Sequence, residues 1–108
     1  MAKRARYSFV YAPEVHAHVN AIDRRYLRQL RETIKEQLSF APQQETGNRK
    51  PLERSLGPYG ATWELRCGPD NRFRIFYEVD AESQEVWILA IGVKDRARLF
   101  IAGKEFVP

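Results

Sequence analysis

The stretch from Trp63 to Val79 constrains the fold more than any other part of the sequence. Its apolar residues recur at every second position on both sides of the turn sequence at 68–71. Because strand side chains point alternately to the two faces of a sheet, this spacing predicts a hairpin of two antiparallel strands. We expect one apolar face made by Trp63, Leu65, Cys67, Phe73, Ile75, Tyr77 and Val79. The opposite face would carry Glu64, Arg66, Arg72, Arg74, Phe76 and Glu78, and arginine beside an aromatic ring suits a phosphate backbone.

The size and composition are those of one globular domain, expected to cover residues 1–108. Hydrophobic residues make up 44% and charged residues 30%, so folding should need neither a metal nor disulfides. One cysteine allows no intramolecular disulfide, which fits a reducing, cytoplasmic location. The net charge of +4 favours an anionic partner. No apolar run approaches the ~20 residues of a membrane span, and the N-terminus does not read as a signal peptide.

The N-terminal part predicts one strand and two helices. Residues 7–11 form the strand, and Pro13 precedes a short helix at about 14–19. Asp23 is expected to cap a longer helix that runs to about Phe40. Apolar residues at i, i+4 and i+8 give this helix one buried stripe, so we expect a helical hairpin lying on the sheet.

The rest of the chain predicts a long loop, three strands and a tail. The loop at 41–60 carries the basic pair Arg49 and Lys50. Strands follow at about 61–67, 72–79 and 84–93, and the last is apolar on both faces, which places it in the sheet centre. The tail at 94–108 is expected to hold one helical turn. The fold class is therefore α+β, with the two helices on a mainly antiparallel four-stranded sheet.

This succession resembles the RelE/ParE superfamily of bacterial toxins from type II toxin–antitoxin systems. The resemblance covers nearly the whole chain. It is carried by Asn48-Arg49-Lys50-Pro51-Leu52, by Trp63-Glu64-Leu65-Arg66, by Arg72-Phe73-Arg74-Ile75-Phe76-Tyr77-Glu78-Val79-Asp80, by Ile88-Leu89-Ala90-Ile91-Gly92-Val93-Lys94 and by Arg98-Leu99-Phe100-Ile101.

The resemblance implies a toxin that causes growth arrest, is held inactive by a cognate antitoxin protein, and needs neither metal nor cofactor. RelE-like members cleave mRNA in the ribosomal A site, whereas ParE-like members poison DNA gyrase. Fold alone does not choose between these activities. We expect a ribosome-dependent mRNA endoribonuclease. A gyrase inhibitor and a catalytically degenerate member that only binds its antitoxin remain the alternatives.

Metal-free RNA cleavage needs a base for the 2′-OH, cations for the phosphorane and an acid for the leaving 5′-oxygen. Arg74 matches the middle-strand arginine of RelE-like toxins and would clamp the scissile phosphate. Arg66 would orient that phosphate or raise the local positive potential, and Lys94 would act as the acid or as a further phosphate contact. Glu64 stands where a lysine is common, and it would be the general base or would only neutralise Arg74.

A second set of residues is expected to contact RNA without reacting, and Arg49 and Lys50 belong to it because side chains on a loop need no packing role. This set is Arg49, Lys50, Arg72, Phe76, Arg96 and Phe100. Phe100 stands where RelE-like enzymes tend to place a tyrosine, and a phenyl ring can stack on a base but cannot donate a proton. Other candidates are weaker: His16 and His18 are expected at the surface with no shared metal, and Cys67 and the two tryptophans in the core.

Overall fold

The computed structural model describes residues 6–52 and 57–107. The elements follow in the order β1 (Ser8–Tyr11), α1 (Val15–Asn20), the 3-10 turn η1 (Arg24–Tyr26), α2 (Leu27–Leu38), β2 (Arg49–Pro51), η3 (Pro58–Gly60), β3 (Trp63–Cys67), η4 (Pro69–Asn71), β4 (Phe73–Asp80), β5 (Glu85–Asp95), β6 (Arg98–Ile101) and β7 (Lys104–Glu105). The predicted α+β class, the two helices and the β3–β4 hairpin are confirmed.

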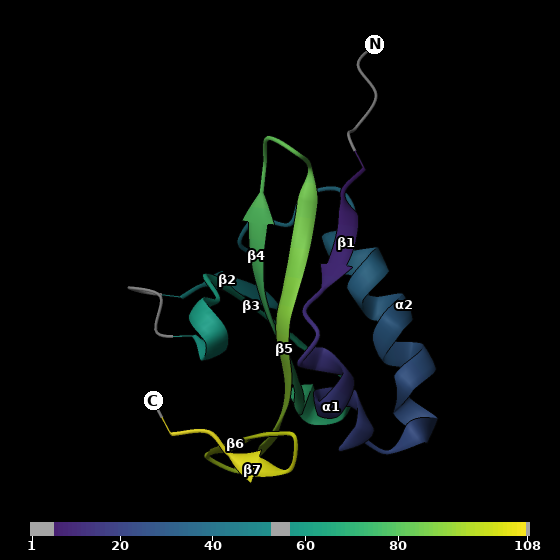
Figure 1. Cartoon of the computed structure of the whole chain (residues 1–108), viewed down its shortest axis with the longest axis vertical. Helices are drawn as coiled ribbons and strands as arrows, with labels where there is room; N and C mark the ends of the chain where they lie inside the picture. Colours follow the sequence, from purple (N-terminus) through teal and green to yellow (C-terminus); the bar gives the residue numbers. More distant parts are fainter. Residues whose placement is uncertain (1–5, 53–56, 108) are drawn as a thin grey trace.

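The strands form one sheet with β5 at its centre. Neighbours follow the order β2-β3-β4-β5-β6-β7, and each of these pairs is antiparallel. β1 lies off this path and runs parallel to the first residues of β5, with Ser8 opposite Glu85. Figure 1 shows β5 running between β4 and β1, with the β6–β7 hairpin at its far end. The sheet has seven strands in the described residues, not the four expected.

Two expectations for the irregular segments were wrong. The 41–60 loop contains β2, because residues 49–51 find ladder partners on the edge of β3. The tail folds into the β6–β7 hairpin instead of a helical turn, since β5 extends to Asp95 and offers its edge to the β-favouring run at 98–101. Arg96 adopts a left-handed backbone conformation, with φ of 59°, that lets the chain reverse direction there.

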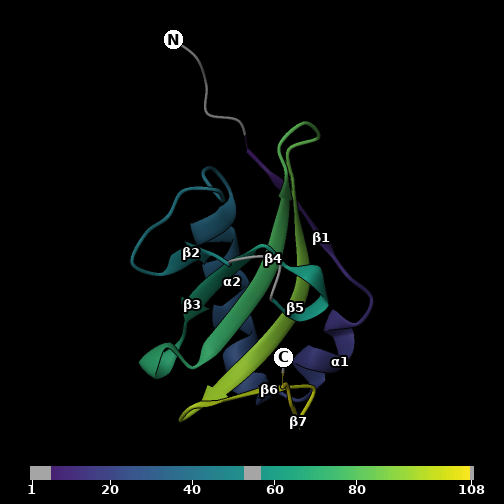
Figure 2. The same ribbon diagram turned by 90° about the vertical axis from the view of Figure 1, so that its left-hand side faces the viewer.

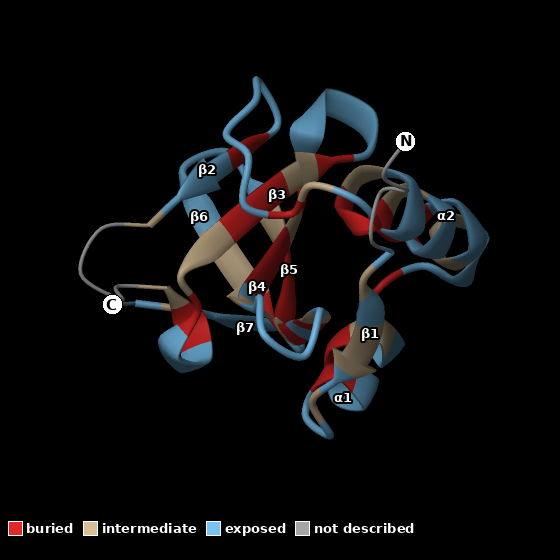
Figure 3. Ribbon diagram, turned by 90° about the horizontal axis from the view of Figure 1, so that it is seen from above, coloured by how far each residue is buried: buried red, intermediate tan, exposed pale blue. Residues whose placement is uncertain are grey.

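The helices cover one face of the sheet. Asp23 accepts a hydrogen bond from the backbone N–H of Arg25 at 3.0 Å, as expected of a cap at the start of the longer helical segment. The stripe of α2 that becomes buried is Leu30, Ile34 and Leu38. Figure 2 shows α2 behind β3, β4 and β5, and Figure 3 shows the buried residues gathered on the central strands and the inner side of α2.

Two apolar clusters lie on opposite sides of the sheet. The larger one is on the helix side and contains the predicted apolar face of the hairpin. The smaller one, on the face away from the helices, consists of Ala61, Phe76, Ala90 and Ile101 with Leu52, Leu89, Leu99 and Phe106 around them. Gly92 allows β6 to approach, because a Cβ there would lie 3.0 Å from the carbonyl oxygen of Phe100. We call the side of the sheet that carries the smaller cluster, away from the helices, the open face.

Tyr77 fixes the long loop to the core. Its buried hydroxyl donates a hydrogen bond to the carbonyl oxygen of Pro42 at 2.7 Å. Burial raises the pKa of Tyr77, and the charge of Arg49 opposes that rise.

We predict that Tyr77→Phe lowers the free energy of unfolding by about 1–3 kcal/mol, because the buried carbonyl of Pro42 loses its hydrogen-bond donor. Urea denaturation measures this, and Tyr11→Phe, at an exposed tyrosine, should change it little.

Candidate functional site

Glu64 and two arginines form an ion cluster on the open face. Glu64 lies opposite Phe76 in the β3–β4 ladder, and Arg66 lies opposite Arg74 two pairs closer to the turn. Nε of Arg66 donates a hydrogen bond to Oε1 of Glu64 at 2.9 Å. Nη1 of Arg74 lies 3.7 Å from the same oxygen. One carboxylate therefore serves two guanidinium groups.

The cluster is partly shielded from water. The exposed fraction of the side chain is 9% for Glu64, 13% for Arg74 and 35% for Arg66. Like charges directly opposite on a ladder repel, so the shared carboxylate offsets an unfavourable Arg66–Arg74 pair. Burial lowers the pKa of Arg74; Glu64 opposes this shift and Arg66 adds to it. Nε of Arg74 also donates to the carbonyl oxygen of Asn71 at 3.1 Å, which fixes the direction of the side chain.

Lys94 lies on the same face as the cluster, on the neighbouring strand β5. Gly92 is the ladder partner of Arg74, and Lys94 lies two residues further along β5, so it shares the open face. Diagonal neighbours of this kind lie about 7–8 Å apart. Lys94 and Glu64 both line an open groove of about 490 Å³. The structure thus gathers all four predicted catalytic residues on one face, and gives Glu64 and Lys94 a common cavity.

Apart from Phe76, the rest of the groove lining comes from residues that were not predicted as site residues. The further lining is made by Leu52, Gly57, Pro58, Phe76, Ala97, Arg98, Leu99, Glu105, Phe106 and Val107. Half of these belong to the β6–β7 hairpin and the residues after it, where a helical turn was expected. The β-favouring apolar run Leu99-Phe100-Ile101 was the available signal for a strand.

Three of the predicted RNA contacts remain exposed. Lys50 pairs with Glu64 in the β2–β3 ladder and so lies on the open face. Arg72 follows the β3–β4 turn, and its carbonyl oxygen accepts a hydrogen bond from the backbone N–H of Lys94 at 2.6 Å. Arg96 lies in the turn between β5 and β6.

Arg49 does not serve as a free RNA contact. Its residue is 9% exposed. Nη1 donates to the carbonyl oxygens of Gln37 at 2.7 Å and of Ala41 at 2.6 Å. These carbonyls belong to the C-terminal end of α2 and the residues after it, where helix carbonyls lack intrahelical partners. Arg49 therefore acts as a structural cap, and the loop assignment that suggested RNA binding was wrong.

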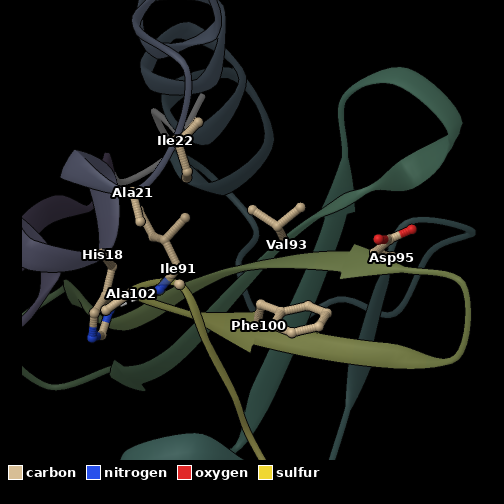
Figure 4. Close-up of a pocket in the computed structure, with 9 residues that line it drawn as sticks. His18, Ala21, Ile22, Ile91, Val93, Asp95, Phe100 and Ala102 are labelled. Carbon is tan, nitrogen blue, oxygen red and sulfur yellow. Dashed lines mark hydrogen bonds between the residues drawn. The ribbon is translucent and has the colours of Figure 1, made fainter.

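Neither of the two predicted aromatic RNA contacts presents a free ring on the open face. Phe76 is 2% exposed and belongs to the smaller apolar cluster, so its ring offers no free stacking surface. Phe100 lies on the helix side of the sheet, in a pocket with Ile22, Ile91 and Val93 (Figure 4). Strand alternation explains this position, because Leu99 is the ladder partner of Lys94 and Phe100 must face the other way.

Two further expectations outside the groove were wrong. Trp87 is 40% exposed, because it alternates with buried Val86 and Ile88 and faces away from the helices. His18 is only 3% exposed, and its Nδ1 accepts a hydrogen bond from the backbone N–H of Ile91 at 3.2 Å. Cys67 lies in the core as expected, and burial raises the pKa of its thiol to about 11.

We predict a pH-dependent stability from His18. Burial lowers its pKa, and Glu14 opposes that shift. Protonation would also turn Nδ1 into a donor facing the Ile91 N–H. The contribution is therefore fully present above the ordinary histidine pKa of about 6.5 and is lost as the pH falls below it. Urea denaturation across pH 7.5–5 should show this loss in the protein and in His16→Gln, but not in His18→Gln; equal slopes in all three would contradict the prediction.

The described residues contain no group of three or more His, Cys, Asp or Glu side chains arranged to hold a metal ion. No helix in the part of the chain that the structure describes is long and apolar enough to cross a membrane.

Comparison with known proteins identifies the family. The model of a family described as the ParE toxin of the type II toxin–antitoxin system parDE matches residues 9–98. The chain belongs to this toxin family. The toxin also superposes on a chain of the crystal structure of the toxin–antitoxin complex RelBE2 from Mycobacterium tuberculosis, with a TM-score of 0.65 and 24% identity over 82% of the toxin and 99% of that chain. At this identity the likeness shows the fold. No curated protein matches the toxin significantly.

Proposed function

We propose that the toxin is an mRNA endoribonuclease that acts on the ribosome and uses the open-face cluster for cleavage. The observation that carries the proposal is the carboxylate of Glu64 held within 4 Å of two guanidinium groups, beside a groove that Lys94 also lines. A carboxylate, two guanidinium groups and an ammonium group supply the base, the anion stabilisers and the acid that RNA cleavage requires.

The reaction follows from the roles of these groups. Glu64 takes the proton of the 2′-OH as its oxygen attacks the adjacent phosphorus. Arg66 and Arg74 release their contacts with Glu64 toward the phosphate oxygens and stabilise the added charge of the phosphorane. Lys94 gives a proton to the 5′-oxygen as the P–O5′ bond breaks. The products are a 2′,3′-cyclic phosphate and a 5′-hydroxyl end, and no redox or metal step is needed.

An antitoxin partner is expected because the chain belongs to a family of toxins from toxin–antitoxin systems. Around the groove, the open face carries five cations, Lys50, Arg66, Arg74, Lys94 and Arg98, against three carboxylates, Glu64, Glu78 and Glu105. Because the cations are in excess, we propose that an acidic segment of the antitoxin covers this face. Binding there would block the groove.

Induced expression tests the proposed activity. During growth arrest we expect new mRNA 5′ ends within translated regions, and none when the Glu64→Gln variant is expressed at the same level. Growth arrest with unchanged transcripts would overturn the ribonuclease.

Gyrase inhibition is the second candidate, and one observation favours it. Phe100 points to the helix side, so within the described residues the groove lining includes neither a tyrosine nor a histidine. A binding mechanism would need no such acid. Inhibition of gyrase supercoiling by the purified toxin, with accumulation of cleaved DNA, would support this candidate, and full supercoiling activity would exclude it.

A further inference from the structure

One part of the groove lining is apolar and includes an aromatic ring. Leu52, Leu99 and Phe106 form an apolar wall there. Phe106 is held by a hydrogen bond from its backbone N–H to the carbonyl oxygen of Leu99 at 2.8 Å, and its side chain is only half-buried. The groove therefore presents an aromatic ring on a fixed backbone close to the ion cluster.

Two basic residues line the groove together with this apolar wall. Lys94 and Arg98 line the same groove as Phe106. Nε of Arg98 lies 3.9 Å from Oε2 of Glu105, but the Arg98 side chain remains 69% exposed, so this contact is weak and can be exchanged for a phosphate. An aromatic ring flanked by cations is the combination that single-stranded nucleic acids recognise, through base stacking and backbone attraction.

We propose that this end of the groove is a nucleotide subsite, where one base of single-stranded RNA stacks on Phe106 and the adjoining phosphate lies between Lys94 and Arg98. The groove volume of about 490 Å³ lies within the range of about 300–1,000 Å³ for small-molecule sites. The subsite places a nucleotide next to the one whose phosphate reaches the Glu64 cluster. This inference deepens the proposed ribonuclease and rests on it for the choice of RNA as the occupant.

Binding without cleavage tests the subsite separately from the reaction. The probe is a fluorescein-labelled hexanucleotide of single-stranded RNA with 2′-O-methyl groups, which cannot undergo 2′-OH attack. Phe106→Leu keeps an apolar side chain in the smaller cluster but removes the ring. We expect it to weaken binding, measured by fluorescence anisotropy, by about 5- to 100-fold. Arg98→Gln should reduce the slope of log affinity against log salt by about 1.

Two variants away from the groove are the matched controls. Tyr11→Leu removes an exposed aromatic ring from β1, and Arg24→Gln removes an exposed arginine from η1; neither should change binding. Thermal unfolding followed by circular dichroism checks that Phe106→Leu remains folded at the assay temperature.

The outcomes separate the subsite from the proposed function. Weaker binding by Phe106→Leu, with the controls unchanged, supports the subsite even if the toxin cleaves no RNA. Equal binding by a folded Phe106→Leu and the unchanged toxin overturns it, even if cleavage is observed. Occupation of this groove by an antitoxin segment, with no binding of the RNA probe by the free toxin, also overturns it.

Discussion

Replacing Arg74 by glutamine should lower the rate of RNA cleavage by about 10²–10³-fold and abolish growth arrest. Arg74 is the guanidinium that ladder geometry and the contact with Asn71 hold in place beside Glu64. Glutamine keeps a polar side chain but cannot offer a charged, bidentate contact to the phosphorane. Single-turnover cleavage of mRNA on programmed ribosomes measures the loss.

Arg28→Gln is the control for Arg74→Gln. Arg28 lies on α2 with 92% of its side chain exposed, and its ion pair with Glu32 at 3.7 Å is a surface contact. Its replacement should leave both cleavage and unfolding unchanged. A folded Arg74→Gln variant that cleaves as fast as Arg28→Gln would remove Arg74 from the reaction.

Replacing Arg49 by methionine should lower the free energy of unfolding by about 2–4 kcal/mol. Methionine fills a similar volume but leaves the Gln37 and Ala41 carbonyls without their charged donor, and such hydrogen bonds contribute about 1.5–3 kcal/mol each. The loss of a cation near the C-terminus of α2 adds to the effect. Urea denaturation measures the change.

Lys50→Met tests whether the effect belongs to Arg49 or to the strand. Lys50 is the next residue of β2 and is exposed, so its replacement should change the free energy of unfolding by no more than about 0.5 kcal/mol. Equal losses in the two variants would show that Arg49 does not cap α2.

Local pattern was sufficient for the regular part of the fold. Alternation predicted the β3–β4 hairpin, and the unbroken apolar run at 86–91 predicted a central strand, because in both cases burial follows directly from the order of residues along one strand. The same alternation placed Glu64, Arg66 and Arg74 on a common face. Membership of the toxin superfamily was also evident from these motifs and is confirmed by the family match.

The errors share a physical cause, which is dependence on partners distant in the sequence. The local sequence around Arg49 indicates a basic residue on a loop. The buried position of Arg49 depends on pairing with β3 and on contact with the end of α2. Phe100 lies on the helix side because the tail forms strand β6, whose residues alternate between the two faces. That strand forms because β5 extends far enough to pair with it. His18 becomes buried through a hydrogen bond to Ile91, 73 residues away. No local pattern records these contacts.

The most direct test of the account is cleavage of a defined mRNA on purified ribosomes by the purified toxin and by its Glu64→Gln variant. We expect the toxin to give a single cut ending in a 2′,3′-cyclic phosphate. Glu64→Gln should bind the ribosome yet cleave about 10²–10⁴-fold more slowly, because glutamine cannot accept the 2′-OH proton. Cleavage at an unchanged rate by Glu64→Gln, or no cleavage by the toxin itself, would contradict the account.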